Sequence, residues 1–275
     1  MTLRIATIAD IHHGQPSHTK RGDTALALMS DFAQWANSES PDLVLDLGDR
    51  ISDVDEETDL RLEAEVAEAF KAVKAPIHHI CGNHDRNHLS TAQNEDILGQ
   101  SLQNELLDCG DWQIALWRAD PKITRSPGSY GFSLPETDLL WLSRTLQAAE
   151  KPTLIVSHVP VSGHSQIGNY YFERNPEVSR YPESARVRQA LSHAKVPAVC
   201  ISGHVHWNTV TTIDGIAHLT QQSLTESFTT QGAPAGAWGM IALSDTVHWQ
   251  IFGADPFEAR LTPKPGRWTP RLEPF

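Results

Sequence analysis

The stretch that decides the fold reads LVLDLGDR and runs from Leu43 to Arg50. Its apolar residues, interrupted only by Asp46, predict a short buried strand that stops at Gly48. Glycine lets the chain turn sharply, so Asp49 is presented at the carboxyl end of the strand. Ligands and catalytic groups collect at that end of the strands in open α/β sheets. A lone Gly-Asp pair is most simply a loop cap, so a functional Asp49 requires donors from other strands.

Four other strand-like runs end in the same way. They end in Asp10-Ile11-His12, Gly82-Asn83-His84-Asp85, Ser157-His158 and Gly203-His204-Val205-His206. With Asp49 they supply seven candidate metal ligands: Asp10, His12, Asp49, Asn83, His158, His204 and His206. One divalent ion takes four to six ligands, so seven converging donors suit two ions with a shared bridge. The pair His204 and His206 can face one ion from extended backbone, or two ions if a turn splays them.

Composition limits the partners that we expect. A chain of 275 residues with 40% hydrophobic content can bury one large core. The formal charge of −12 argues against a polymeric nucleic acid as partner, although a small anion can bind where metal ions make a site positive. Three scattered cysteines argue against a disulfide framework. We see no signal peptide and no apolar run long enough to span a bilayer, so we expect a cytoplasmic protein without membrane contact.

The order of elements predicts two packed sheets flanked by helices, because strands alternate with helices early and β segments dominate the end. We expect one domain over residues 1–261 and a proline-rich tail over 262–275 that wraps the surface or a partner subunit. Residues 118–132 are expected to form a loop. An acidic amphipathic helix is expected near residues 59–73, with the charged face of Asp59–Glu68 in solvent.

The chain resembles the calcineurin-like metallophosphoesterase superfamily. The resemblance covers most of the chain and rests on five motifs in order: Asp10-x-His12, Gly48-Asp49, Gly82-Asn83-His84-Asp85, His158 and Gly203-His204-x-His206. It implies an αββα sandwich of two packed mixed sheets flanked by helices. It also implies two metal ions bridged by Asp49. The first would be bound by Asp10, His12, Asp49 and His206, and the second by Asp49, Asn83, His158 and His204.

The resemblance further implies that His84 contacts the phosphoryl group or the leaving oxygen, with Asp85 orienting its ring. The motif style is closest to bacterial cyclic-nucleotide and glycerophosphodiester phosphodiesterases. One departure concerns a second aspartate that many relatives have three residues after the bridging one. This chain has Ser52 there and Asp53 one residue further, which puts the geometry of that loop in question.

Other residues are candidates for substrate binding. Arg50 and Arg86 each follow a motif directly, and each is equally consistent with bidentate phosphate binding and with a surface ion pair. The long loop of residues 159–182 contains Tyr170 and Tyr171. Its aromatic rings suit either a lid that stacks on a substrate base or a contact between subunits.

The function that we predict is hydrolysis of a small phosphodiester by attack of metal-bound hydroxide, with His84 assisting the leaving alkoxide. The donors suit Mn, Fe or Zn. A phosphomonoesterase acting on a nucleotide or sugar phosphate is the alternative within enzymology. A nuclease is disfavoured because we find no basic stripe. A non-catalytic metal-binding scaffold is the rival from another class, but such a protein is expected to have lost ligands. The sequence leaves the substrate, the metals and a homo-oligomeric state open.

Overall fold

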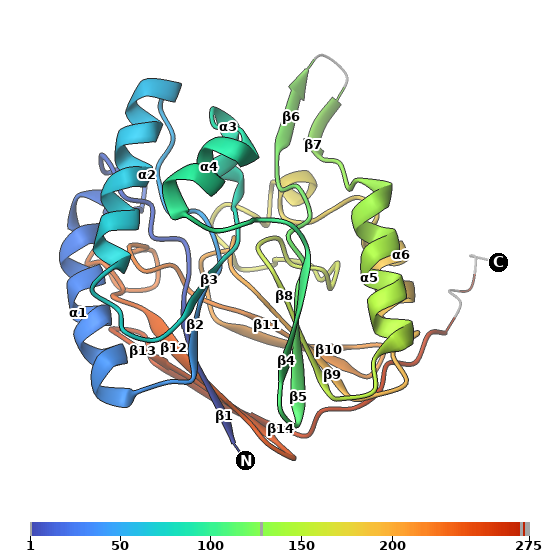
Figure 1. Cartoon of the computed structure of the whole chain (residues 1–275). Helices are drawn as coiled ribbons and strands as arrows, with labels where there is room; N and C mark the ends of the chain where they lie inside the picture. The colour runs from blue at the N-terminus through green and yellow to red at the C-terminus, as the bar shows by residue number, and fades with distance from the viewer. Residues whose placement is uncertain (1, 127–128, 270–271, 273–275) are drawn as a thin grey trace.

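Two six-stranded β-sheets pack face to face, and helices cover their outer faces (Figure 1). This computed structural model describes residues 2–126, 129–269 and 272. The core between the sheets contains Trp112, Ile241 and Trp249, all at most 2% exposed. The predicted sandwich of two mixed sheets flanked by helices is therefore confirmed.

The first sheet has the strand order β14-β13-β12-β1-β2-β3. Its strands are β1 (Leu3–Ile8), β2 (Leu43–Asp46), β3 (Ile77–His79), β12 (Trp238–Leu243), β13 (Val247–Phe252) and β14 (Phe257–Leu261). β1, β2 and β3 run parallel, whereas β12, β13 and β14 continue the sheet in antiparallel fashion. Because the carboxyl ends of parallel strands meet at one edge, the segments after β1, β2 and β3 lie side by side.

The second sheet has the order β10-β11-β9-β8-β5-β4. Its strands are β4 (Glu105–Cys109), β5 (Trp112–Leu116), β8 (Thr153–Ser157), β9 (Ala198–Ser202), β10 (Thr209–Ile213) and β11 (Ile216–Thr220). The four central strands are parallel, and β4 and β10 are antiparallel edges. A separate hairpin of β6 (Ile123–Ser126) and β7 (Ser129–Phe132) occupies the segment that we expected to be a loop, so that expectation was wrong.

Helices α1 (Ala25–Glu39) and α2 (Glu56–Phe70) cover the first sheet, and α5 (Glu136–Ala148) and α6 (Ser184–Leu191) cover the second (Figure 1). The short helices α3 (Asn83–Asn87) and α4 (Thr91–Leu98) follow β3, and one-turn 3₁₀ helices lie at η1 (Gly22–Thr24) and η2 (Pro176–Val178). No described helix is both long and apolar enough to span a membrane.

The acidic helix differs from the sequence prediction. α2 begins earlier than expected because Asp55 caps it, accepting a hydrogen bond from the Thr58 amide at 2.8 Å. Its charged face is not all in solvent: Asp59 and Glu63 are fully buried. Asp59 accepts the Val54 amide at 2.8 Å, and Glu63 pairs with Arg50. The prediction of a wholly solvated face was therefore wrong.

The C-terminal segment returns to the second sheet. Lys264 forms a β-bridge with Ala198, and the Arg267 amide donates to the Asp214 carbonyl at 2.7 Å. The remainder of the expected tail, residues 270–271 and 273–275, lies outside the described residues.

Candidate metal centre

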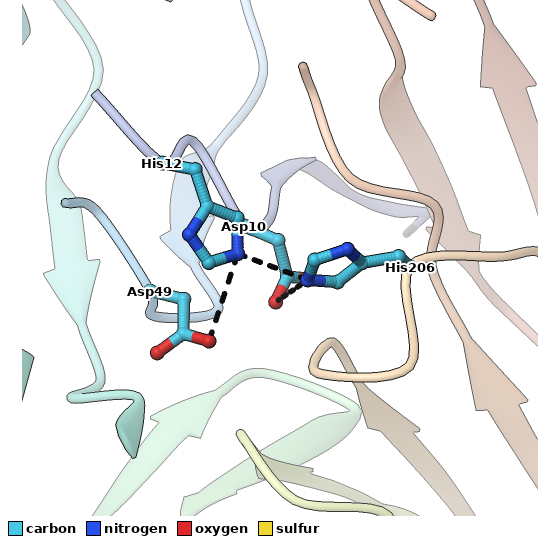
Figure 2. Close-up of side chains that lie close together, drawn as sticks. All are labelled: Asp10, His12, Asp49 and His206. Atoms are coloured by element: carbon cyan, nitrogen blue, oxygen red, sulfur yellow. Dashed lines mark hydrogen bonds and ion pairs between the residues drawn. The ribbon is translucent and has the colours of Figure 1, made fainter. Parts of the chain in front are cut away.

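Six of the seven predicted donors form two overlapping groups at the carboxyl edges of the two sheets. Asp10, His12, Asp49 and His206 place one ligand atom each within 4.8 Å of one another, and Asp49, His158 and His204 do the same. Figure 2 shows the first group, in which the four side chains point toward a common centre. The seventh donor, Asn83, places Oδ1 3.3 Å from His158 Nε2.

Unusual backbone conformations aim these donors. Five of them have positive φ: Asp10 (50°), His12 (50°), Asp49 (56°), His204 (71°) and His206 (61°). Non-glycine residues adopt this region rarely, and such residues concentrate at functional sites. Two glycines make room for the carboxylates. A Cβ at Gly82 would lie 2.1 Å from Asp49 Oδ1, and one at Gly203 would lie 2.6 Å from Asp10 Oδ2. Both motifs therefore require glycine, because a side chain at either position would collide with a carboxylate of the proposed metal site.

The first group holds its nitrogen and oxygen atoms at short range. Nε2 of His206 lies 2.9 Å from Nε2 of His12 and 3.5 Å from Oδ1 of Asp10. Nε2 of His12 lies 3.8 Å from Oδ2 of Asp49. The other nitrogen of His206, Nδ1, lies 2.8 Å from Oε2 of buried Glu226. A carboxylate on the far nitrogen is the usual support for a metal-binding histidine.

The second group contains a buried nitrogen with no protein partner. His204 Nε2 hydrogen-bonds the Val178 carbonyl at 2.7 Å, while its Nδ1 is buried and unpaired among the described residues. His158 is oriented in the same manner, with Nδ1 2.8 Å from the Leu47 carbonyl and Nε2 3.4 Å from Asp49 Oδ2. Buried polar atoms rarely lack a partner, so the orphaned Nδ1 fits a metal ion.

Asp49 is placed to bridge the two groups. Its Oδ2 faces both His12 and His158, while its Oδ1 accepts the His84 amide at 2.8 Å. Without a cation, burial and charge pairing compete among the donors. Despite burial, Asp49 and His158 favour each other's charged forms, so the pKa of Asp49 lies well below its usual range and the pKa of His158 is raised to about 9. At two other donors burial prevails. Burial raises the pKa of Asp10 to about 7 and lowers the pKa of His204 to about 3. Divalent cations would supply the positive charge that ionised carboxylates need there, so the residues fit two metal ions.

The structure places Asp53, rather than Asp85, against His84. His84 Nδ1 pairs with Asp53 Oδ1. Asp85 is fully buried and accepts the amides of Gly82, Asp49 and Arg50 at 2.8, 2.9 and 2.8 Å. It therefore ties the two motif loops together and does not touch the His84 ring. Burial opposes ionisation of Asp53, but its hydrogen bonds lower its pKa to about 2. The aspartate displaced by one residue in the sequence thus supports the His84 ring.

The two candidate arginines face away from the metal ligands. Arg50 is fully buried, with Nη1 2.8 Å from Asp46 Oδ2 and Nε against Glu63. It is neither a surface ion pair nor a phosphate ligand. Arg86 donates to the Leu89 carbonyl, and its Nε lies 3.6 Å from Asp120 Oδ1. It lines a separate pocket that contains none of the donors.

A cleft of about 310 Å³ opens over the donors. Tyr170 and Tyr171 line it, as expected for residues that meet substrate. The lining residues that were not predicted include Lys20, Arg125 and Tyr130. They stand singly in polar segments without a motif, so the sequence gives no signal for them. Glu226 lacked a signal for the same reason, whereas Asp53 was marked in the sequence by its shift of one residue from the position of an aspartate in many relatives.

Aspartate, histidine and asparagine donors gathered at the carboxyl edges of two packed mixed sheets are the donor set that a dinuclear metallohydrolase requires. Residues 3–208 match the family described as calcineurin-like phosphoesterase, and the chain belongs to that family. The family binds two divalent metals and hydrolyses phosphoric esters. No curated protein matches the chain.

Several solved structures share the fold. A dimetal phosphatase from Danio rerio has 17% identity and a TM-score of 0.72, over 94% of this chain and 98% of that one. GAP50, the anchor in the inner membrane complex of Plasmodium, has 15% identity and a TM-score of 0.59, over 96% and 89%. A putative 5'-nucleotidase from Staphylococcus aureus has 13% identity and a TM-score of 0.52, over 100% and 56%. At these identities the likeness shows the fold alone.

Proposed function

We propose that this chain hydrolyses a small phosphodiester at a centre of two divalent ions, Mn, Fe or Zn. One ion is held by Asp10, His12, Asp49 and His206, and the other by Asp49, Asn83, His158 and His204. The observation that carries the proposal is the position of Asp49 Oδ2 between the two donor groups. When bound, such ions activate a water molecule and neutralise the attacking and leaving oxygens.

His84 is the residue that we assign to the leaving group. Its ring lines the cleft and is held from behind by Asp53, so it is positioned without being one of the proposed ligands. A positioned imidazole can donate a proton to a departing alkoxide. Asp53 contributes by fixing which ring nitrogen faces the cleft.

The cleft mouth supports a diester over a monoester. A diester carries a second organic group, and the mouth offers Tyr130, Tyr170 and Tyr171 to contact it. A phosphomonoesterase is the second candidate, because a putative 5'-nucleotidase shares the fold. The scaffold alternative is weakened by the donor set, since all seven predicted ligands are present and gather at one site.

The test is hydrolysis of bis(4-nitrophenyl) phosphate and 4-nitrophenyl phosphate by the Mn-loaded protein. We expect the diester to have the higher kcat/KM, and Asp49→Ala to abolish turnover of both. A higher kcat/KM for the monoester would establish the second candidate. Absence of turnover of either ester by a protein that contains two ions per chain would establish the scaffold.

A further inference from the structure

Lys20 lines the cleft from the polar loop after β1. Its Nζ lies 3.5 Å from Nδ1 of the proposed metal ligand His12, and its side chain lines the cleft beside Asp49 and His84. Among the described residues that line the cleft there is one other basic side chain of lysine or arginine, that of Arg125, which belongs to the β6–β7 hairpin. Lys20 is thus the basic side chain in direct contact with the proposed metal centre.

The loop that carries Lys20 is fixed to the body of the protein. Backbone hydrogen bonds of 3.0 and 2.8 Å pair Ser17 with Lys20, and the Arg21 amide donates to the Thr225 carbonyl at 2.9 Å. The Ser227 hydroxyl donates to the Thr19 carbonyl. The anchoring segment also contains Glu226, the partner of His206. The position of Lys20 relative to the metal ligands is therefore defined by the fold.

The Lys20 ammonium has no carboxylate committed to it. Within the described part of the chain no carboxylate oxygen lies within 4.0 Å of Nζ, although four carboxylates act on it from further away. Each of the four has another partner. Asp10 and Asp49 face the proposed ions, Asp53 holds His84, and Glu226 holds His206. Lys20 is half-buried, and withdrawing an ammonium from water without such a partner is costly, so an anion is expected to complete its environment.

Metal binding removes the acceptor that Lys20 contacts within the described part of the chain, Nδ1 of His12. A neutral imidazole carries a single N–H, so a histidine that gives Nε2 to a metal holds its hydrogen on Nδ1. Nδ1 of His12 then cannot accept from Lys20. The ammonium must turn to another acceptor in the cleft, where a phosphoryl oxygen of the substrate would lie beside the ions.

We propose that Lys20 is a substrate-binding residue whose ammonium binds a non-bridging phosphoryl oxygen in the metal-loaded protein. The inference rests on the proposed phosphoesterase function. In it, the Lys20 ammonium binds the same phosphoryl group as the two proposed ions. The interaction is an ammonium–oxyanion hydrogen bond of the charge-assisted kind.

Inorganic phosphate is the probe, and its binding is measured by titration calorimetry on Mn-loaded protein freed of excess metal. The variants are Lys20→Met, Lys20→Arg and the control Lys71→Met, which removes the same charge from a lysine whose side chain is 72% exposed. We expect Lys20→Met to weaken phosphate binding about 10- to 100-fold, as for loss of a hydrogen bond to a charged group. Lys20→Arg should retain most of the affinity, and Lys71→Met all of it. Metal content should stay at two ions in every protein.

Equal phosphate affinity of Lys20→Met and wild type overturns the inference. Loss of metal from Lys20→Met also overturns it, because Lys20 would then act by positioning His12. In both cases ester hydrolysis by the wild type leaves the proposed function standing. A metal-loaded wild type that neither binds phosphate nor hydrolyses an ester removes both proposals.

Discussion

The His84 ring lines the cleft. It is paired with Asp53 and packs edge-on against the His12 ring at a centroid distance of 4.8 Å. A general acid, the role that we propose for His84, contributes about 10²–10⁴ to the rate, and most when the leaving group is a poor one. His84→Ala should therefore slow hydrolysis of an alkyl diester far more than that of a nitrophenyl diester. The measurement is kcat on both esters with metal content checked. An equal loss on both would show that His84 stabilises phosphoryl charge instead.

Replacing Asp53 with asparagine should affect catalysis, whereas replacing Asp85 with asparagine should affect stability. Asp53→Asn removes the charged support of the His84 ring, so we expect the same dependence on leaving group as for His84→Ala with little change in stability.

Asp85→Asn places a donor amide against three backbone N–H groups and leaves Arg50 short of a charge. We expect it to cost about 3–5 kcal/mol of unfolding free energy, as for a broken buried pair. Chemical denaturation and kcat together test this, and an Asp85→Asn protein with the unfolding free energy of the wild type would contradict it.

At the residue scale, the sequence could predict donors that follow apolar runs within short motifs. It could not predict which neighbour of a motif turns inward. Arg50 stands directly after Asp49, yet its guanidinium is buried under the site with Asp46 and Glu63. Glu226 and Lys20 lie outside the motifs, 20 residues after His206 and 8 residues after His12, and only folding brings them to these ligands. Such contacts depend on tertiary packing, which a single sequence does not display.

At the scale of elements, parallel strand order accounts for the success of the motif analysis. Asp10 follows β1 and Asp49 follows β2, so their positions were fixed once those strands were recognised. The sequence of residues 118–132 contains a turn-marking pair, Pro127-Gly128. The β6–β7 hairpin was nevertheless missed, because strands of four residues each are too short to show clear alternation. Its register pairs Ile123 with Phe132, whose ring packs against Tyr181 at a centroid distance of 5.4 Å. The hairpin is thus stabilised by Tyr181 of the long loop of residues 159–182, a contact that the hairpin's own sequence does not reveal.

The long loop of residues 159–182 is part of the metal centre as well as of the cleft. The Val178 carbonyl binds His204, and the Asn169 side chain donates to the Val205 carbonyl at 2.8 Å. Shortening the loop would therefore disturb the donors, and a point change tests the lid proposal better. Tyr171→Ala removes an aromatic face that is 42% exposed. We expect the ranking of diesters by kcat/KM to change, with metal content intact. An unchanged ranking would leave Tyr171 to another role, such as a contact between subunits.

Helix α2 meets β2 through a buried cluster in which one guanidinium, Arg50, serves three carboxylates: Asp46, Glu63 and Asp85. Burial raises the pKa of Glu63 to about 8, against the opposing effect of Arg50. The folded protein thus keeps a proton that the unfolded chain has released above its ordinary pKa of 4.5. This contribution to stability is complete below about pH 4.5 and is lost as the pH rises through about 8.

Glu63→Gln should remove that pH dependence, because glutamine keeps the carbonyl that faces Arg50 and cannot ionise. We expect the unfolding free energy of the metal-loaded wild type to fall relative to that of the variant between about pH 5 and pH 8. Urea denaturation of both proteins across this range measures the difference. Parallel pH profiles would show that Glu63 is ionised throughout.

On the scale of the whole molecule, the proposed metal centre joins the two sheets. Asp10, His12, Asp49 and Asn83 extend from the first sheet, whereas His158, His204 and His206 extend from the second. Five of these seven have positive φ, so their loops are held in conformations that are unfavourable in isolation. Ions shared between the sheets would offset that cost. The sandwich and its helices could be predicted from the pattern of elements, but this coupling follows only from the convergence of the donors.

Chelation should therefore lower the stability of the entire fold. At free metal 100 times its Kd, each site adds about 2.7 kcal/mol, and a domain of this size shifts its Tm by roughly 2–4 °C per kcal/mol. Two ions should then raise the Tm by roughly 10–20 °C over the metal-free protein. Asp49→Ala should abolish most of this shift, since it removes the bridge between the ions, whereas Asp108→Ala on the surface should preserve it. Calorimetry with elemental analysis tests the prediction. One ion or fewer in the fully loaded wild type would contradict the dinuclear centre, and a metal-independent Tm with two ions bound would show that the sheets hold together without them.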